Sequence, residues 1–207
     1  MKIIDNKLTK NNARGIEELA INIDMVNGFV KEGTLASPSI MRIVPRQQEI
    51  LKEFLEADNK GIMFIQDTHT KDSIEFKTFG PHCIKGSGEE KVIKELYEYY
   101  RYALHIKKNS TNFVFGKHFQ EEISNLKMLR KVILMGCLSE VCVKNGGITL
   151  RNYFDELNRD IDIYVAPDAI DTYDAPGHDS LEVTERAIND MKANGIKVLE
   201  RKITYGK

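Results

Sequence analysis

Short apolar runs alternate with amphipathic stretches along most of this 207-residue chain, and that alternation limits the fold more than any other feature. Short apolar runs are typical of buried strands, whereas apolar residues at helical spacing predict helices that cover a sheet. We expect strands at about 19–24, 61–66, 104–106, 132–135, 161–165 and 196–199, and helices at about 45–57, 89–100, 119–129, 139–154 and 179–193. The sequence therefore predicts an α/β fold, a three-layer αβα sandwich with a mostly parallel Rossmann-like central sheet of about six strands.

The composition narrows the class of protein. Thirty basic against 31 acidic residues give a net charge of -1, which argues against a nucleic-acid or membrane partner. Hydrophobic residues make up 42%, enough for the core of a single domain over 1–207, with residues 1–16 as a polar lead-in. Three cysteines form no disulfide framework, and no apolar run is long enough for a signal peptide or a membrane span. We therefore expect a cytoplasmic protein and leave a homo-oligomer open.

Polar residues follow several of the predicted strands. Asp24, Asp67 and Lys108 come directly after strands, and Cys142 lies near the start of the helix after another. Because ligands of parallel α/β sheets bind beyond the carboxyl ends of the strands, we expect these four side chains to converge at one edge.

Cys142 is the candidate nucleophile. Ser139 and Glu140 can begin a helix that places this thiol near a helix N-terminus, which favours the thiolate. Asp24 could then take the thiol proton and Lys108 could stabilise the thiolate. Each residue also has an ordinary interpretation: a small core residue, a loop cap and a solvated charge, respectively.

A second set of residues is typical of a metal site. Asp67, His69, Glu75 and His82 lie within sixteen residues of an irregular segment, and mixed nitrogen and oxygen ligands suit Zn²⁺, Mn²⁺ or Fe²⁺. The alternative is that these are ordinary surface side chains. Cys83 is not included, because side chains adjacent in sequence usually diverge.

Aromatic residues flank these polar candidates. Phe29, Phe79, Phe113 and Phe115 each lie in a loop, where rings could form walls for a flat heteroaromatic ligand or simply pack on the core.

Taken together, these motifs resemble those of the nicotinamidase branch of the isochorismatase-like cysteine hydrolases, over about Leu19 to Leu199. Asp24 to Phe29 matches the family pattern D-x-x-x-x-F, and Lys108 is similar to the family lysine. Gly136 to Val143 resembles the nucleophile motif G-x-x-T-D-x-C-V, with Ser and Glu in place of Thr and Asp. Asp67-Thr68-His69, Glu75 and the segment PHCIKGSG at 81–88 resemble the metal loop of nicotinamidases. The chain departs from its relatives at Gly146-Gly147, where they usually carry Thr-Ala.

The resemblance implies a cysteine hydrolase that cleaves the carboxamide of nicotinamide to nicotinate and ammonia. It implies an Asp24-Lys108-Cys142 triad and a cis peptide at Cys137–Leu138 that orients the backbone N–H groups of Leu138 and Cys142 as an oxyanion hole. It further implies a metal, zinc before manganese or iron, that orients an aromatic carboxamide substrate. The alternatives are an isochorismatase-type or other small amide or carbamoyl hydrolase on the same fold, and a catalytically silent scaffold.

Overall fold

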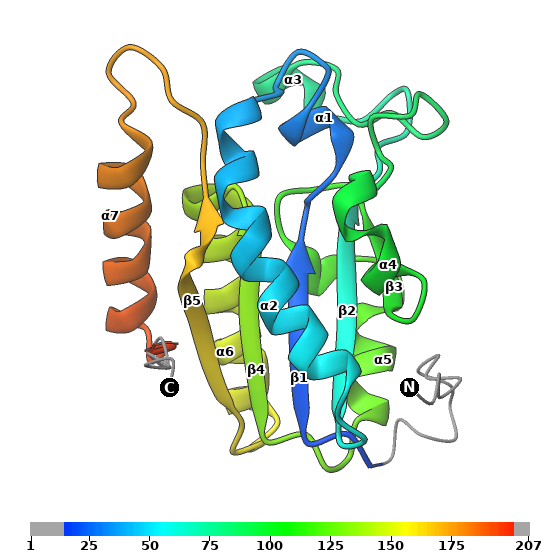
Figure 1. The fold of residues 1–207 in the computed structure, drawn as a ribbon, viewed down its shortest axis with the longest axis vertical. Helices are drawn as coiled ribbons and strands as arrows, with labels where there is room; N and C mark the ends of the chain where they lie inside the picture. Colours follow the sequence, from blue (N-terminus) through cyan, green and yellow to red (C-terminus); the bar gives the residue numbers. More distant parts are fainter. Residues whose placement is uncertain (1–14, 201–207) are drawn as a thin grey trace, which may run out of the picture.

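Six parallel strands form the centre of the protein in a computed structural model that describes residues 15–200 (Figure 1). The strand order in the sheet is β3-β2-β1-β4-β5-β6, and every neighbouring pair is parallel. The strands are β1 Glu18–Ile23, β2 Lys60–Asp67, β3 Leu104–Lys108, β4 Lys131–Cys137, β5 Asp162–Asp171 and β6 Lys197–Val198. Most of the predicted lead-in, residues 1–14, lies outside the described residues.

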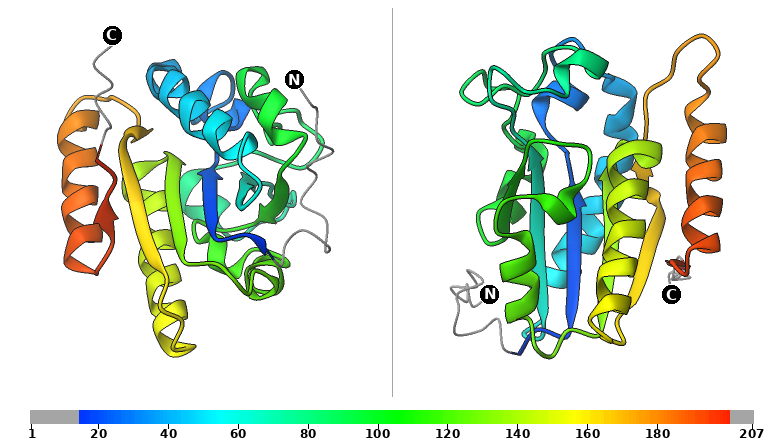
Figure 2. Two further views of the ribbon diagram at one scale, coloured as in Figure 1. Left: turned by 60° about the horizontal axis from the view of Figure 1, so that its bottom comes forward. Right: turned by 180° about the vertical axis from the view of Figure 1, so that it is seen from behind.

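Helices cover both faces of this sheet. The helices are α1 Asn27–Val30, α2 Val44–Leu55, α3 Phe76–Phe79, α4 Tyr97–Tyr100, α5 Phe119–Asn125, α6 Lys144–Glu156 and α7 Ser180–Ala193. Helices α2 and α4 lie in front of the sheet in Figure 1, whereas α5 and α6 lie in front when the protein is seen from behind in Figure 2, with α7 beside them at the β5 side. The predicted three-layer αβα fold is therefore confirmed. Within residues 15–200, no helix is long and apolar enough to cross a membrane.

The central strands β1 and β2 are largely apolar on both faces because each face packs against a helical layer. In β1, Leu19 and Ile21 belong to the core cluster beneath α5 and α6, whereas Ala20 belongs to the cluster beneath α2. In β2, Ile65 belongs to the cluster beneath α5 and α6, and Phe64 belongs to the cluster beneath α2. Successive side chains of a strand point to opposite faces, so a strand between two layers reads as a continuous apolar run. This explains why the strands were readily predicted.

The predicted helix at 89–100 is wrong over its first half. Only a 3-10 turn at Lys94–Leu96 and the single turn of α4 are present. The Glu90 carboxylate instead accepts hydrogen bonds from the N–H groups of Gly86 and Gly88. The backbone of Ile93 donates to the Met25 carbonyl, 3.0 Å away. Local hydrogen bonds of Glu90 and the backbone contact with Met25 thus keep residues 89–93 out of a helix despite their helical apolar spacing.

The other predicted elements differ mainly at their ends. The helix predicted at 119–129 ends at Asn125, and the strand predicted at 161–165 continues to Asp171 past a register shift between Leu134 and Gly136 of β4. The helix predicted from Ser139 begins as a π-helical turn, Ser139–Val143, which leads into α6. Cys142 lies in this π-helical turn, which is frequently a feature of functional sites.

Candidate active site

The strand register brings the three predicted strand-end residues together. Asp67 and Lys108 are direct partners at the ends of β2 and β3. Asp24 follows β1, and its N–H donates to the Ile65 carbonyl of β2 at 3.0 Å. Because neighbouring parallel strands end at the same edge, side chains more than forty residues apart in sequence become neighbours.

Lys108 lies at the centre of this group. Its Nζ is 2.8 Å from Asp24 Oδ2 and 2.9 Å from Asp67 Oδ1, and it lies 3.7 Å from Cys142 Sγ. The side chains of Lys108 and Asp24 are fully buried, and those of Asp67 and Cys142 nearly so. A buried ammonium with two carboxylates and a thiol around it can hold charge and transfer a proton without competition from water.

Close backbone packing allows the thiol to reach this cluster. Gly136 pairs with Ile23 in β1 and has φ of +125°. A Cβ at this position would overlap the Ile23 carbonyl oxygen, so only glycine fits. The peptide bond Cys137–Leu138 that follows is cis. The Leu138 carbonyl then accepts hydrogen bonds from the N–H groups of Val141 and Val143, which closes the π-helical turn around Cys142.

Burial controls the protonation of the two reacting groups. It raises the pKa of Asp24 to about 6, although the Lys108 ammonium acts in the opposite direction. Burial also raises the pKa of the Cys142 thiol well above its usual range, against the effect of Lys108 and with the Asp24 carboxylate adding to the increase. The expectation that a helix N-terminus would favour a resting thiolate is therefore wrong. Burial thus favours a neutral thiol that needs a base, and the Lys108 ammonium contacts both this thiol and Asp24.

The predicted metal ligands also form a cluster. One donor atom from each of Asp67, His69, Glu75 and His82 lies within 4.8 Å of the others. Asp67 Oδ2 is 2.9 Å from His69 Nε2 and 3.1 Å from His82 Nε2, and the two Nε2 atoms are 3.1 Å apart. Ligands bound tetrahedrally at roughly 2.0–2.1 Å from zinc would be about 3.4 Å apart, so these spacings fit a single ion.

The hydrogen bonds of the two imidazoles support this assignment. His82 Nδ1 lies 2.8 Å from the Gly80 carbonyl, which can only accept, so Nδ1 carries the proton. His69 Nδ1 lies 3.1 Å from Asn109 Oδ1, an oxygen that also accepts from the Thr70 N–H. In the neutral imidazoles both Nε2 lone pairs then point at each other and at a carboxylate. A cation bound between these atoms would accept the lone pairs and remove their mutual repulsion, so the donors fit a divalent metal.

Asp67 connects this cluster to the triad. Its Oδ1 binds the Lys108 ammonium and its Oδ2 faces the two histidines. Burial alone would raise the pKa of Asp67, but the Lys108 charge and the histidine hydrogen bonds outweigh burial and hold it well below the usual range. Asp67 is therefore ionised throughout the neutral pH range, as a metal ligand must be.

The four predicted aromatic residues lie in different surroundings. Phe29 is buried with its ring centroid 5.5 Å from that of His82. Phe79 is 40% exposed at the end of α3. Phe113 is fully buried in the core against Phe119, and Phe115 is 69% exposed, beside a surface hollow of about 340 Å³. Of the four, Phe29 is the ring placed in contact with the histidine cluster.

Two residues of this region were missed by sequence reasoning. The ring of Phe76 lies 5.1 Å from that of His69 and 5.7 Å from that of His82, and Asn109 orients His69. Phe76 follows the predicted ligand Glu75 directly, and Asn109 follows Lys108. The sequence signal that could have identified them is adjacency, to a predicted ligand for Phe76 and to the predicted catalytic lysine for Asn109.

Comparison with known proteins identifies a family. The family model described as "Isochorismatase domain" matches residues 18–202. A search of curated proteins found no match.

Several solved structures are similar to this one. A pyrazinamidase from Pyrococcus horikoshii in complex with zinc is 25% identical, with a TM-score of 0.68 over 89% of this chain and 99% of that one. A nicotinamidase from Bacillus subtilis is 21% identical, with a TM-score of 0.74 over 89% of this chain and 100% of that one. An N-carbamoylsarcosine amidase from Thermoplasma acidophilum is 21% identical, with a TM-score of 0.71 over 92% of this chain and 100% of that one.

Proposed function

Because this chain belongs to the isochorismatase family, we propose that it is a cysteine amidohydrolase that cleaves nicotinamide to nicotinate and ammonia. One observation carries the proposal. The Lys108 ammonium contacts Asp24, Asp67 and the Cys142 thiol at once, and Asp67 also faces a set of metal-type donors. A general base, a nucleophile and a site for orienting a ring are thereby joined through shared contacts.

In the first half of the proposed reaction, Asp24 takes the proton of the Cys142 thiol, which contacts the same Lys108 ammonium as Asp24 does. The sulfur then attacks the carboxamide carbon. The N–H groups of Leu138 and Cys142 stabilise the oxyanion, and removal of one such donor typically costs roughly 10²–10³ in rate. Asp24 returns its proton to the amide nitrogen, the C–N bond breaks, and ammonia leaves behind a Cys142 thioester.

In the second half, water attacks the thioester carbon. Asp24 takes a proton from this water, the C–S bond breaks and the thiolate regains that proton; the carboxylic acid that is released gives its own proton to ammonia in solution and becomes nicotinate. Lys108 keeps its charge throughout, because Asp24 and Asp67 raise its pKa well above the ordinary value even though burial opposes them. Its role is to hold Asp24 and to lower the energy of the thiolate.

Asp67, His69, Glu75 and His82 would hold a divalent metal beside this triad. Zinc suits the mixed donors, with manganese or iron as alternatives, and the similar pyrazinamidase structure contains zinc. When bound, the metal would supply a Lewis acid that can coordinate a ring nitrogen. Phe29 and Phe76 flank the histidines and offer apolar walls to a flat ring, and Phe79 stands near the end of the same loop.

Ammonia release from a panel of carboxamides tests the proposal. We expect nicotinamide to be hydrolysed by the wild-type protein and by no preparation of Cys142→Ala, which should still bind nicotinamide. Chelation with EDTA should weaken nicotinamide binding. Ammonia release by Cys142→Ala at close to the wild-type rate would refute the assignment of the nucleophile.

A second candidate is a small amide or carbamoyl hydrolase on the same fold, favoured by the structural similarity to an N-carbamoylsarcosine amidase. This candidate keeps Asp24, Lys108 and Cys142 but needs no ring-orienting metal. Turnover of carbamoyl compounds that is insensitive to EDTA, with no turnover of nicotinamide, would support it instead. Free buried cysteines and balanced charge fit our proposal that the enzyme acts in the cytoplasm.

A further inference from the structure

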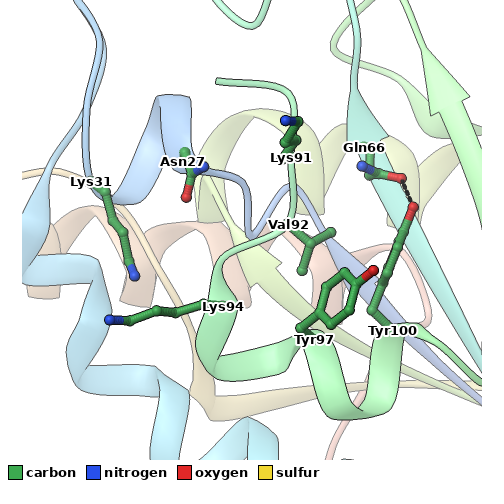
Figure 3. A pocket seen from close by; sticks show the side chains of 8 residues that line it. All are labelled: Asn27, Lys31, Gln66, Lys91, Val92, Lys94, Tyr97 and Tyr100. Atoms are coloured by element: carbon green, nitrogen blue, oxygen red, sulfur yellow. Dashed lines mark hydrogen bonds between the residues drawn. The ribbon is translucent and has the colours of Figure 1, made fainter. Parts of the chain in front are cut away.

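Polar side chains also gather outside the proposed catalytic cluster. One group lines a groove of about 690 Å³ on the α4 side of the sheet (Figure 3). The charge of this groove is balanced within the protein, because the Glu90 and Glu95 carboxylates interact with the three lysines that line it. Another group joins the turn that carries Cys142 to the loop between β5 and α7, and it is therefore connected to the proposed nucleophile.

Glu140 is the residue that makes this connection. It lies two residues before Cys142 in the π-helical turn Ser139–Val143, which we call the nucleophile turn. Its Oε1 accepts a hydrogen bond from Thr172 Oγ1 at 3.0 Å and lies 3.3 Å from His178 Nε2. Both partners belong to the β5–α7 loop, residues 172–179. The Glu140 side chain, which is only 20% exposed, thus ties the nucleophile turn to this loop.

The β5–α7 loop is firmly held where Glu140 contacts it. Asp171, the last residue of β5, receives two hydrogen bonds from the Arg42 guanidinium, at 2.8 Å to Oδ1 and 2.7 Å to Oδ2. Asp174 Oδ1 accepts from the Ser180 N–H at 2.9 Å. Thr172 lies between these two contacts and is fully buried. Its hydroxyl is therefore a fixed donor for the Glu140 carboxylate.

His178 adds a second contact from the same loop. Its ring stacks on that of Tyr173, with 3.9 Å between centroids and 4° between the planes. Its Nδ1 lies 2.9 Å from the Tyr173 carbonyl, which can only accept, so Nδ1 carries a proton. Nε2 then donates to Glu140 only from the imidazolium. Thr172 thus supplies a contact that does not depend on protonation, and His178 adds an ionic one when its ring is doubly protonated.

The nucleophile turn has little backbone support of its own, because Val141 and Val143 both donate to the single carbonyl of Leu138. A further side-chain tie comes from Ser139, whose hydroxyl lies 2.9 Å from Thr184 Oγ1 of α7. Side chains at the start of the turn thus determine where the sulfur lies. A misplacement of about 1 Å can cost roughly 10²-fold in rate, so this placement matters for catalysis.

From these contacts we propose that Glu140 is a positioning residue for the nucleophile. Through Thr172 and His178, it holds the nucleophile turn in place. The Cys142 sulfur thereby stays beside the Lys108 ammonium, 3.7 Å from Nζ. This inference rests on the proposed role of Cys142 as the nucleophile. Glu140 contributes no atom to the triad or to the metal donors, so its loss should slow the chemical step without weakening substrate binding.

Kinetics of loop and turn variants test this role. Glu140→Ala should lower kcat for nicotinamide roughly tenfold or more, with KM changed less than about twofold. Glu140→Gln keeps an oxygen that accepts from Thr172 and should restore kcat to within about threefold of the wild type. Thr172→Val removes the same hydrogen bond from the other side. The double variant Glu140→Ala/Thr172→Val should therefore be no slower than Glu140→Ala alone.

A matched control is available on α7. Glu182→Ala removes a carboxylate that is 69% exposed and pairs with Arg186 at 3.7 Å, away from the nucleophile turn. This variant should have the kcat and KM of the wild type. Urea unfolding shows whether each variant is folded, and Thr172→Val takes the place of Glu140→Ala if the latter does not fold.

Crystal structures of the wild type, Glu140→Ala and Glu182→Ala test the placement without turnover. We expect Cys142 Sγ to lie about 1 Å or more farther from Lys108 Nζ in Glu140→Ala and to stay in place in Glu182→Ala. A displaced sulfur in an enzyme that does not hydrolyse nicotinamide would support the positioning role while refuting the proposed reaction. An unmoved sulfur, an unchanged kcat in Glu140→Ala, or a loss that appears entirely in KM would each overturn the inference.

Discussion

Acidification of the enzyme from pH 7 to pH 5 should switch off its base. Asp24 is fully buried, and burial raises its pKa to about 6 even though Lys108 Nζ lies 2.8 Å from Oδ2. A protonated Asp24 cannot accept the proton of Cys142. We therefore expect kcat/KM for nicotinamide to fall on the acidic side with an apparent pKa near 6, far above that of an ordinary carboxyl group.

The size of the fall follows from this shift. A change from 3.8 to about 6 corresponds to about 3 kcal/mol at about 1.36 kcal/mol per pKa unit. With a pKa near 6, the ionised fraction of Asp24 is about 0.9 at pH 7 and about 0.09 at pH 5, so kcat/KM should drop about tenfold. The apparent value belongs to the coupled group of Asp24, Asp67, Lys108 and Cys142 as a whole.

The assay is the initial rate of ammonia release at low nicotinamide concentration between pH 4.5 and 8.5. Metal content is measured at each pH, because protonation of His69 and His82 would release a bound ion and also lower the rate. Asp24→Asn should show only background activity across the range. A fully metal-loaded enzyme whose rate stays flat from pH 7 to pH 5 would refute the reasoning.

The same shift predicts how Asp24 affects stability. Its folded pKa lies above its unfolded value, so the native state binds the proton more tightly between pH 4 and 6. The contribution of Asp24 to the free energy of unfolding should therefore decrease by about 3 kcal/mol as pH rises through this window. Asp67 has the opposite sign: its pKa is lowered in the fold, so its stabilisation is lost only in strong acid, below its unfolded value of 3.8.

Two substitutions test residues that position the site or pack behind it. Asn109→Ala removes one of the two hydrogen-bond partners of His69 Nδ1, the other being the Ser73 hydroxyl, so metal affinity measured by competition with a chelator should fall roughly 10-fold; an unchanged affinity would contradict this role. Gly146→Ala places a methyl group against the buried ring of Phe113, so urea unfolding should show a loss of about 1–2 kcal/mol. The control Gly15→Ala enters open space and should change stability by less than about 0.5 kcal/mol.

The strand-end residues were predictable because parallel topology determines where they go. Once β1, β2 and β3 are recognised as neighbouring parallel strands, Asp24, Asp67 and Lys108 must lie at one edge. The apolar runs made β1 and β2 recognisable, since both are buried on both faces, whereas the edge strand β3 has alternate residues exposed. That residues 1–207 form a single domain remains a prediction.

The parts that sequence reasoning missed depend on tertiary contacts. Burial of the thiol decides the direction of the Cys142 pKa shift, and a helix-start pattern carries no information on burial. The segment at 89–93 is not helical because Ile93 donates to the Met25 carbonyl and the Glu90 carboxylate accepts from the adjacent glycine turn. Phe113 and Phe115 are two residues apart, yet one is in the core and the other exposed. Both residues belong to one 3-10 turn, which points their side chains in different directions, and the sequence does not reveal this.

Chemical trapping of the reaction tests the central claim most directly. Wild-type protein mixed with excess nicotinamide and quenched in acid within the first turnovers should yield a nicotinoyl group on the peptide that contains Cys142, identified by mass spectrometry. The Cys142→Ala variant should yield none, whereas Cys83→Ala should retain the adduct if it folds. Turnover of nicotinamide by the wild-type protein without an acyl group on Cys142, or with the acyl group on another residue, would contradict the account.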